Sequence, residues 1–128
     1  MLVVRTDFSD QQAWEAVRTT IETPNEDGFR AYGEVIDDPA YRDLPTDRVL
    51  TMVRQDGAEH RFMAVVDRTT LGSAEMPLLV IDQRAEPDGA IRVIATEFWS
   101  IDNNLSIANM DYEEFADAVD EDGTFRGF

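Results

Sequence analysis

Apolar runs of strand length and apolar residues at helical spacing alternate along the first half of the chain. Leu2–Val4 is a short apolar run of the kind that forms a buried strand. Trp14, Val17 and Ile21 then recur three and four residues apart, which predicts an amphipathic helix with Ser9 as its N-cap. A strand followed by a helix is therefore the first predicted unit.

The segment from residue 24 to residue 45 has little periodicity. Tyr32–Ile36 is a candidate strand within it. Thr46 is then a candidate N-cap for a short helix whose apolar face contains Val49 and Val53.

Three strands are predicted in the centre of the chain, at Phe62–Val66, Leu78–Ile81 and Ala90–Ala95. Turn residues at Pro87–Gly89 predict that the last two pair as an antiparallel hairpin. The connection Asp67–Pro77 has about the minimum length of a parallel crossover, so the relative direction of the first two strands stays open.

The last third of the chain is helical in pattern. Phe98, Ile101, Leu105 and Ala108 recur at spacings of three and four, and Thr96 is the candidate cap of this helix.

A second C-terminal helix is predicted to begin after Asp111 and to extend to Asp122. Asp111 and Glu114 have the spacing of a capping box, and Met110 and Phe115 have that of a hydrophobic staple.

Together these elements predict a single α/β or α+β domain over residues 1–128. We expect a mixed sheet of about four strands, packed with the N-terminal helix and the two C-terminal helices.

Composition excludes several classes of chemistry. The chain has 128 residues, 43% of them hydrophobic, one His and no Cys, so disulfides, thiolate metal sites, cysteine nucleophiles and imidazole clusters are excluded. We therefore expect no cofactor. No apolar stretch reaches the roughly 20 residues of a membrane helix, and Leu2–Val4 runs straight into charged residues instead of a secretory signal, so a cytoplasmic location is expected.

Charge is the strongest global feature of the sequence. A net charge of −16 disfavours direct binding to nucleic acid or to an anionic membrane and favours a basic protein partner. All 11 basic residues are Arg, so genomic base composition or adaptation to high salt is an alternative explanation of the acidity. The oligomeric state stays open.

The densest acidic segment lies in the predicted last helix. Its members are Glu113, Glu114, Asp117, Asp120, Glu121 and Asp122. Like charges three or four residues apart destabilise a helix by roughly 0.2–0.5 kcal/mol per pair, and acids in the last turn oppose the helix dipole. The segment is either a solvated helix face or a surface that binds a basic partner.

Asn103 and Asn104 fall in the middle of the preceding helix, where Asn has poor propensity. A local kink or a buried side-chain network would explain them, and so would contact with a ligand or partner.

Three carboxylates offer an alternative site. Asp7, Asp67 and Asp82 each close an apolar strand, and in a parallel sheet such ends meet at one edge. Three carboxylates there could bind a divalent metal and support catalysis in a small enzyme, although Asp is also a common residue for leaving a strand. The cluster requires the parallel crossover.

The stretch Trp99–Phe128, WSIDNNLSIANMDYEEFADAVDEDGTFRGF, and the opening LVVRTDFSDQQAWEAV resemble a family of small acidic bacterial proteins of uncharacterised function. More distantly, NNLSIANMDYEEFA is similar to the ends of some immunity proteins from bacterial toxin systems. The second resemblance implies protein binding. The leading hypothesis is thus a non-enzymatic acidic binding module, such as an immunity or inhibitor protein that occludes a basic surface, with the metal-dependent enzyme as the alternative.

Overall fold

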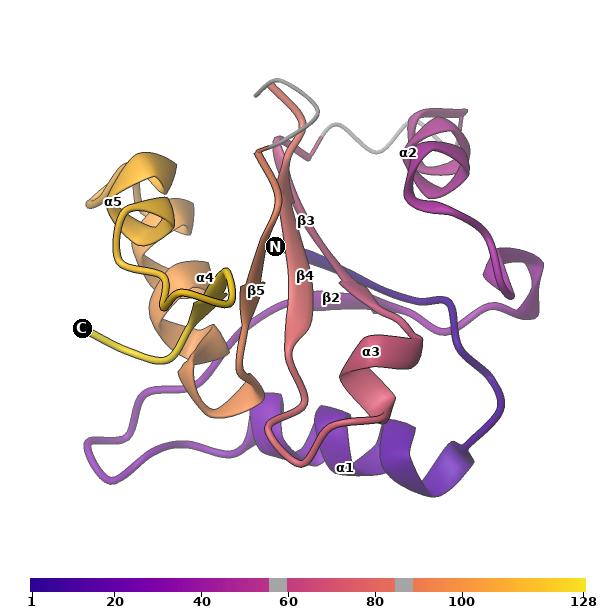
Figure 1. Ribbon diagram of the computed structural model, residues 1–128, viewed down its shortest axis with the longest axis horizontal. Helices are drawn as coiled ribbons and strands as arrows, with labels where there is room; N and C mark the ends of the chain where they lie inside the picture. Colours follow the sequence, from indigo (N-terminus) through magenta and orange to yellow (C-terminus); the bar gives the residue numbers. More distant parts are fainter. Residues whose placement is uncertain (56–59, 85–88) are drawn as a thin grey trace.

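One mixed β-sheet forms the centre of the molecule (Figure 1). The computed structural model describes residues 1–55, 60–84 and 89–128. The strands in these residues are β1 (Leu2–Arg5), β2 (Glu34–Ile36), β3 (Phe62–Val66), β4 (Leu78–Asp82), β5 (Ile91–Val93) and β6 (Thr124–Phe125). Their order across the sheet is β2-β1-β3-β4-β5-β6. The mixed sheet is as predicted, but the described residues form six strands where about four were expected.

Strand direction divides the sheet into two kinds of pairing. β1 runs parallel to both β2 and β3, and β5 runs parallel to β6. β4 is antiparallel to both of its neighbours, β3 and β5. The predicted hairpin of β4 and β5 is therefore confirmed, although residues 87 and 88 of its predicted turn lie outside the described residues.

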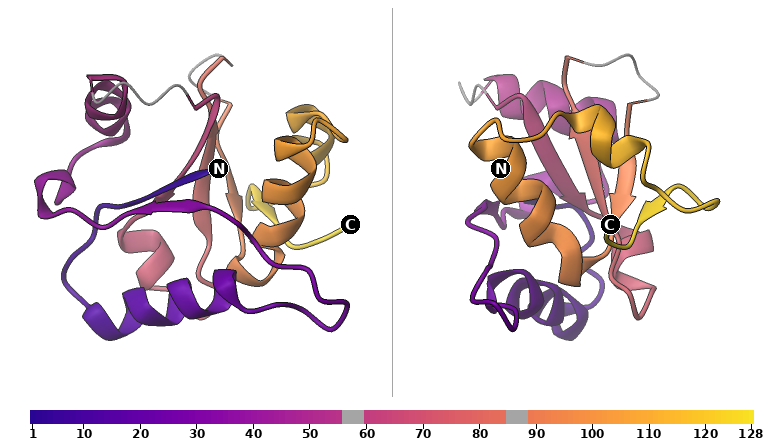
Figure 2. Two further views of the ribbon diagram at one scale, coloured as in Figure 1. Left: turned by 180° about the vertical axis from the view of Figure 1, so that it is seen from behind. Right: turned by 90° about the vertical axis from the view of Figure 1, so that its left-hand side faces the viewer.

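Helices cover both faces of the sheet (Figure 2). The α-helices in the described residues are α1 (Gln11–Glu22), α2 (Thr46–Gln55), α3 (Arg68–Leu71), α4 (Phe98–Ser106) and α5 (Tyr112–Ala116). Short 3-10 helices, η1 (Pro39–Tyr41) and η2 (Ala95–Glu97), precede α2 and α4. None of the helices in the described part of the chain has the length and apolarity to cross a membrane.

Alternation along the strands sends apolar side chains into two separate cores. On one face, Val3, Val80 and neighbouring strand residues pack against Trp14 of α1 and Phe115 of α5. On the other face, Leu2 and the strand residues that share this face of the sheet pack against α2. Burial on both faces explains why the central strands are almost continuously apolar in sequence.

Several helix ends differ from the predictions. Asp10, and not Ser9, caps α1, because the Asp10 carboxylate accepts a hydrogen bond from the Ala13 N–H. Thr46 is the first residue of its helix and not the residue before it. Thr96 lies inside η2, so α4 begins at Phe98, one residue later than a cap at Thr96 predicts.

Helix α4 also ends earlier than its apolar pattern indicates. Phe98, Ile101 and Leu105 are buried as predicted. Ala108 is exposed and has a φ of 54°, a left-handed conformation that stops the helix at Ser106. Sequence spacing alone does not reveal this turn, because Ala favours a helix.

Near the C-terminus lies a strand that the sequence pattern did not predict. β6 has only two residues, too few to show alternation, and it pairs with β5 at the edge of the sheet. Its Phe125 is fully buried and packs edge-on against Phe115, with ring centroids 5.2 Å apart. This contact holds the C-terminal segment against α5.

Candidate functional site

The helix that was expected to carry the acidic face is short. The capping box is present as predicted, because the Glu114 carboxylate accepts a hydrogen bond from the Asp111 N–H at 2.8 Å. Tyr112 and Phe115 face the core. The helix ends at Ala116, however, and not at Asp122, so the prediction of one continuous acidic helical face is wrong. Residues 117–123 instead form the turns that lead to β6.

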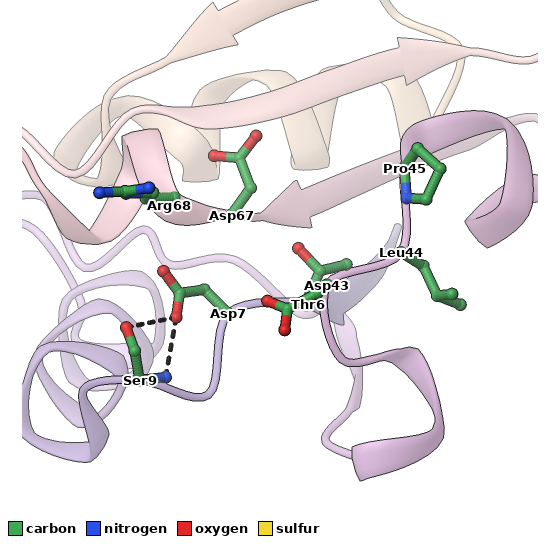
Figure 3. Close-up of a pocket in the computed structure, with 8 residues that line it drawn as sticks. All are labelled: Thr6, Asp7, Ser9, Asp43, Leu44, Pro45, Asp67 and Arg68. Atoms are coloured by element: carbon green, nitrogen blue, oxygen red, sulfur yellow. Dashed lines mark hydrogen bonds between the residues drawn. The ribbon is translucent and has the colours of Figure 1, made fainter.

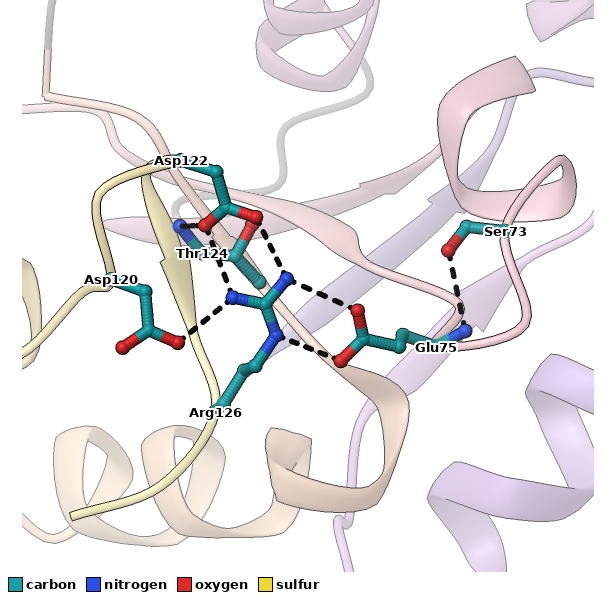
Figure 4. A network of polar contacts seen from close by, with 6 residues as sticks. All are labelled: Ser73, Glu75, Asp120, Asp122, Thr124 and Arg126. Carbon is teal, nitrogen blue, oxygen red and sulfur yellow. Dashed lines mark hydrogen bonds and ion pairs between the residues drawn. The ribbon is translucent and has the colours of Figure 1, made fainter.

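Two of the predicted acidic residues hold an arginine of the same chain (Figure 4). Arg126 donates to Asp120 at 2.8 Å and makes a bidentate contact with Asp122, at 2.7 and 3.1 Å. From the other side it makes a second bidentate contact with Glu75, at 2.8 and 3.1 Å. Hydrogen bonds from Arg126 hold the pKa of the Glu75 and Asp122 carboxyls below their ordinary values. Three carboxylates around one guanidinium still leave this cluster negative.

The Arg126 cluster also accounts for Asp120 and Asp122, the last carboxylates of the predicted acidic helix apart from Glu121. Asp120 and Asp122 point their carboxylates at Arg126, and the Thr124 N–H donates to Asp122 at 3.1 Å. Two features of the sequence point to this cluster. Arg126 follows Asp122 by four residues, and Glu75 lies just before the strand that pairs with β5, although its proximity depends on the fold.

Three members of the predicted acidic surface keep exposed carboxylates that have no partner within the described residues. Glu113, Asp117 and Glu121 are exposed, and their side chains form no ion pair or hydrogen bond within the described residues. The pKa of Arg61 is raised mainly by its hydrogen bond to Asp82, and the negative charge of Glu113 makes a smaller contribution. We call Glu113, Asp117 and Glu121 the open carboxylates.

Asn103 and Asn104 use their amide groups within the protein. Asn103 donates to the carbonyl oxygens of Arg30 and Trp99, at 2.9 and 2.7 Å. Asn104 donates to Ser100 at 2.8 Å and accepts a hydrogen bond from the Asn109 amide at 3.0 Å. Asn103 therefore ties α4 to the loop before β2, and Asn104 bonds within α4 and to the turn that follows it.

The neighbouring carboxylate, Asp102, is 2% exposed and anchors two distant segments. It accepts a hydrogen bond from the Met1 ammonium at 2.8 Å and another from the Tyr32 N–H, also at 2.8 Å. Asp102 therefore fixes the start of β1 and the segment before β2 to α4.

The three strand-end carboxylates do not meet. Asp7 and Asp67 follow the parallel strands β1 and β3 and lie at the same edge of the sheet. Asp82 ends the antiparallel strand β4, where it pairs with Phe62 at the start of β3. It therefore lies at the opposite end of the strands from Asp7 and Asp67. The prediction that the three carboxylates form one metal site is therefore wrong, because the strand that follows the Asp67–Pro77 connection runs antiparallel to β3. Within the described residues, no group of three or more acidic or His side chains is arranged to hold a metal ion.

Asp82 has an ion pair instead of a metal. Arg61 contacts both of its carboxylate oxygens, at 3.1 and 2.9 Å, and the Arg84 N–H donates to it at 3.0 Å. Burial by itself would raise the pKa of the Asp82 carboxyl, but these hydrogen bonds and the charge of Arg61 outweigh burial and lower it.

A cavity of about 490 Å³ lies at the edge that Asp7 and Asp67 share (Figure 3). Its lining residues are Thr6, Asp7, Ser9, Asp43, Leu44, Pro45, Asp67 and Arg68. Sequence reasoning found Asp7 and Asp67 but missed Asp43, which comes from the loop before α2. The Asp43 N–H donates to the Thr6 carbonyl at 2.8 Å, and this hydrogen bond fixes the loop beside the end of β1.

Asp67 lines this cavity, but its carboxylate is already paired with other residues of the protein. It caps α3 through a capping box with Thr70, and Arg92 of β5 contacts both of its carboxylate oxygens, at 2.8 and 2.9 Å. Burial by itself would raise the pKa of the Asp67 carboxyl, but the hydrogen bond and the charge of Arg92 outweigh it and lower the pKa. Asp67 is therefore a structural carboxylate.

Comparison with known proteins identifies the family but not an activity. No curated protein matches the chain. A family model described as a domain of unknown function (DUF6924) matches residues 1–128. The predicted resemblance to a family of uncharacterised function is thereby confirmed, and the likeness to immunity proteins stays a prediction. Over its whole length, the chain belongs to the DUF6924 family.

Proposed function

We propose that the protein is a non-enzymatic binding module that presents its C-terminal carboxylates to a basic protein surface. The observation that carries this proposal is the set of open carboxylates, Glu113, Asp117 and Glu121, on α5 and the turn that follows. Exposed carboxylates without a cation of their own are available to Arg or Lys side chains of a partner.

The Arg126 cluster supports the same surface in a different way. Its residual negative charge adds to the potential around α5, while Arg126 fixes the turn on which Asp120 and Asp122 lie. A fixed backbone reduces the entropy that would be lost when a partner binds. Asn103 and Asn104 are not needed in this proposal, because their amides are bound internally.

Aromatic residues provide an apolar element beside the carboxylates. Phe128 is 76% exposed, yet its ring lies 5.3 Å from Phe115 and 5.0 Å from Phe125. An aromatic side chain held in place at an exposed position is a common anchor in protein interfaces. An immunity or inhibitor protein that occludes a basic surface fits this combination of acidic and aromatic groups.

Affinity capture from the lysate of the native host at low salt, with elution in salt steps, tests the proposal. The test variant carries Glu113→Gln, Asp117→Asn and Glu121→Gln. We expect a stoichiometric basic partner that binds the wild type, elutes at moderate salt because exposed charges are screened, and is lost from the variant.

A matched control variant separates this surface from overall acidity. Glu15→Gln, Asp27→Asn and Asp47→Asn remove the same amount of charge at exposed positions on α1, in the loop after it and on α2. The partner should still bind this variant. Equal loss from both variants, or binding that does not depend on ionic strength, would refute the proposed surface.

A further inference from the structure

The cavity at the carboxyl ends of β1 and β3 has features of a ligand site that the proposed protein interface does not use. Its volume of about 490 Å³ falls in the roughly 300–1,000 Å³ range of small-molecule sites. The ends of parallel strands are where open α/β sheets bind ligands. The C-terminal acidic segment contributes no residue to it.

Asp7 provides a buried negative charge with one oxygen available. The residue is 8% exposed, and its Oδ1 accepts hydrogen bonds from the Ser9 N–H at 2.8 Å and the Ser9 hydroxyl at 2.6 Å. Its Oδ2 has no hydrogen-bond partner among the described residues. In Figure 3 this oxygen points away from Ser9, toward the side of the cavity that carries Arg68.

Arg68 provides a positive charge on the same cavity. It lines the opening and is exposed, and its guanidinium has no hydrogen bond or ion pair with any described residue. Asp67, the neighbouring carboxylate, is already neutralised by Arg92. Asp7 and Arg68 therefore present one free negative and one free positive group without pairing with each other.

We propose that this cavity binds a small zwitterion, a molecule that carries an ammonium and a carboxylate group as an α-amino acid does. The ammonium donates to Asp7 Oδ2, and the carboxylate accepts from the Arg68 guanidinium. Leu44 and Pro45 supply an apolar wall for the side chain of the ligand. Asp43, exposed at the rim, adds a second negative charge and favours a ligand with a basic side chain.

A matched series of small molecules tests each charge separately. L-Norleucine carries both groups, hexanoate lacks the ammonium, pentylamine lacks the carboxylate, and L-lysine adds a terminal cation. Titration at millimolar concentration, followed by amide NMR, should shift the signals of Thr6, Asp7 and Arg68 with norleucine and lysine. Hexanoate and pentylamine should bind at least roughly tenfold more weakly, because each lost group removes a hydrogen bond to a charged residue.

Variants of the chain complete the test. Arg68→Gln changes an exposed residue and should weaken norleucine binding roughly tenfold or more, whereas Arg48→Gln, an exposed arginine of α2 outside the cavity, should not. Asp7→Asn should have the same effect as Arg68→Gln, and Asn can still accept the hydrogen bonds from Ser9. Asp43→Asn suits the φ of 57° at this position and should abolish the preference for lysine over norleucine.

Three results would overturn the proposal. The first is that neither amino acid shifts the NMR signals at the cavity. The second is that hexanoate or pentylamine binds as tightly as norleucine. The third is that the Arg68→Gln variant binds norleucine with the affinity of the wild type. Because the cavity and the open carboxylates share no residue, the capture experiment and this titration can fail independently.

Discussion

Replacing Asp67 with Asn should destabilise the protein by about 2 kcal/mol at neutral pH. Asp67 follows β3 and holds Arg92 of β5 across the intervening strand β4, and the two side chains are only 28% and 23% exposed. Asn still accepts a hydrogen bond at a helix N-terminus, so α3 keeps its cap. What the substitution removes is the charge, and charged hydrogen bonds contribute about 1.5–3 kcal/mol each.

The Asp67→Ala variant separates the cap from the ion pair. Ala removes both, and loss of a cap costs about 1 kcal/mol, so this variant should be less stable than Asp67→Asn by that amount. Urea denaturation of the wild type, both variants, Arg92→Gln and the double variant gives the coupling energy between the two residues. We expect a coupling of about 1–2 kcal/mol, as for residues in direct contact.

The effect should depend on pH with a defined sign. The pKa of the Asp67 carboxyl is lower in the folded protein than its ordinary value of 3.8. Its contribution to stability is therefore complete above about pH 4–5 and is lost as the pH falls through the lowered folded pKa. The difference in the free energy of unfolding between the wild type and Asp67→Asn should therefore shrink as the pH falls below about 4. An Asp67→Asn variant within 0.5 kcal/mol of the wild type at pH 7, or a negligible coupling energy, would show that Arg92 and Asp67 do not pair in solution.

Three further substitutions test other parts of the structure by urea denaturation. Phe115→Ala should cost about 3–5 kcal/mol, because it leaves a cavity under the C-terminal segment, and a cost near zero would argue against this packing. Asp102→Asn should cost about 3 kcal/mol or more by leaving the buried Met1 ammonium without its counter-charge, whereas a surface-sized effect would contradict burial of the pair. Arg126→Gln should lower stability slightly at low salt, and the effect should fade at high salt, since this arginine relieves repulsion among three exposed carboxylates. A decrease that persists at high salt would indicate lost packing instead.

The strands were predictable because burial on both faces leaves a plain record in the sequence. Phe62–Val66 and Leu78–Ile81 are continuous apolar runs, and each lies in a central strand that has a neighbour on both sides. β6 was not predictable, because two residues cannot show a pattern and their pairing depends on β5. The direction of β4 was also open, since a connection that contains only the one-turn helix α3 is compatible with either direction.

The candidate sites were less predictable than the fold, because charged residues are defined by their partners. Asp111 and Glu114 formed the predicted capping box, since both partners lie within one turn of helix. Asp122 pairs with Arg126, and the same guanidinium also pairs with Glu75. Glu75 is distant in sequence, and the pairing of the strands brings it near. Asp82 was placed at the wrong edge for the same reason. Local signals predict local contacts, and long-range ion pairs require the topology.

The positions of the arginines show which carboxylates are paired within the protein and which are left exposed. Several of the 11 basic residues join elements that are distant in sequence, as Arg61, Arg92 and Arg126 do through bidentate contacts with carboxylates. Acidity that reflected only base composition or high salt would leave exposed carboxylates spread evenly, and the control variant on α1 and α2 would then behave like the α5 variant. A partner that distinguishes the two variants would show instead that the open carboxylates are placed where no arginine among the described residues reaches them, so that a cation from another protein can take that position.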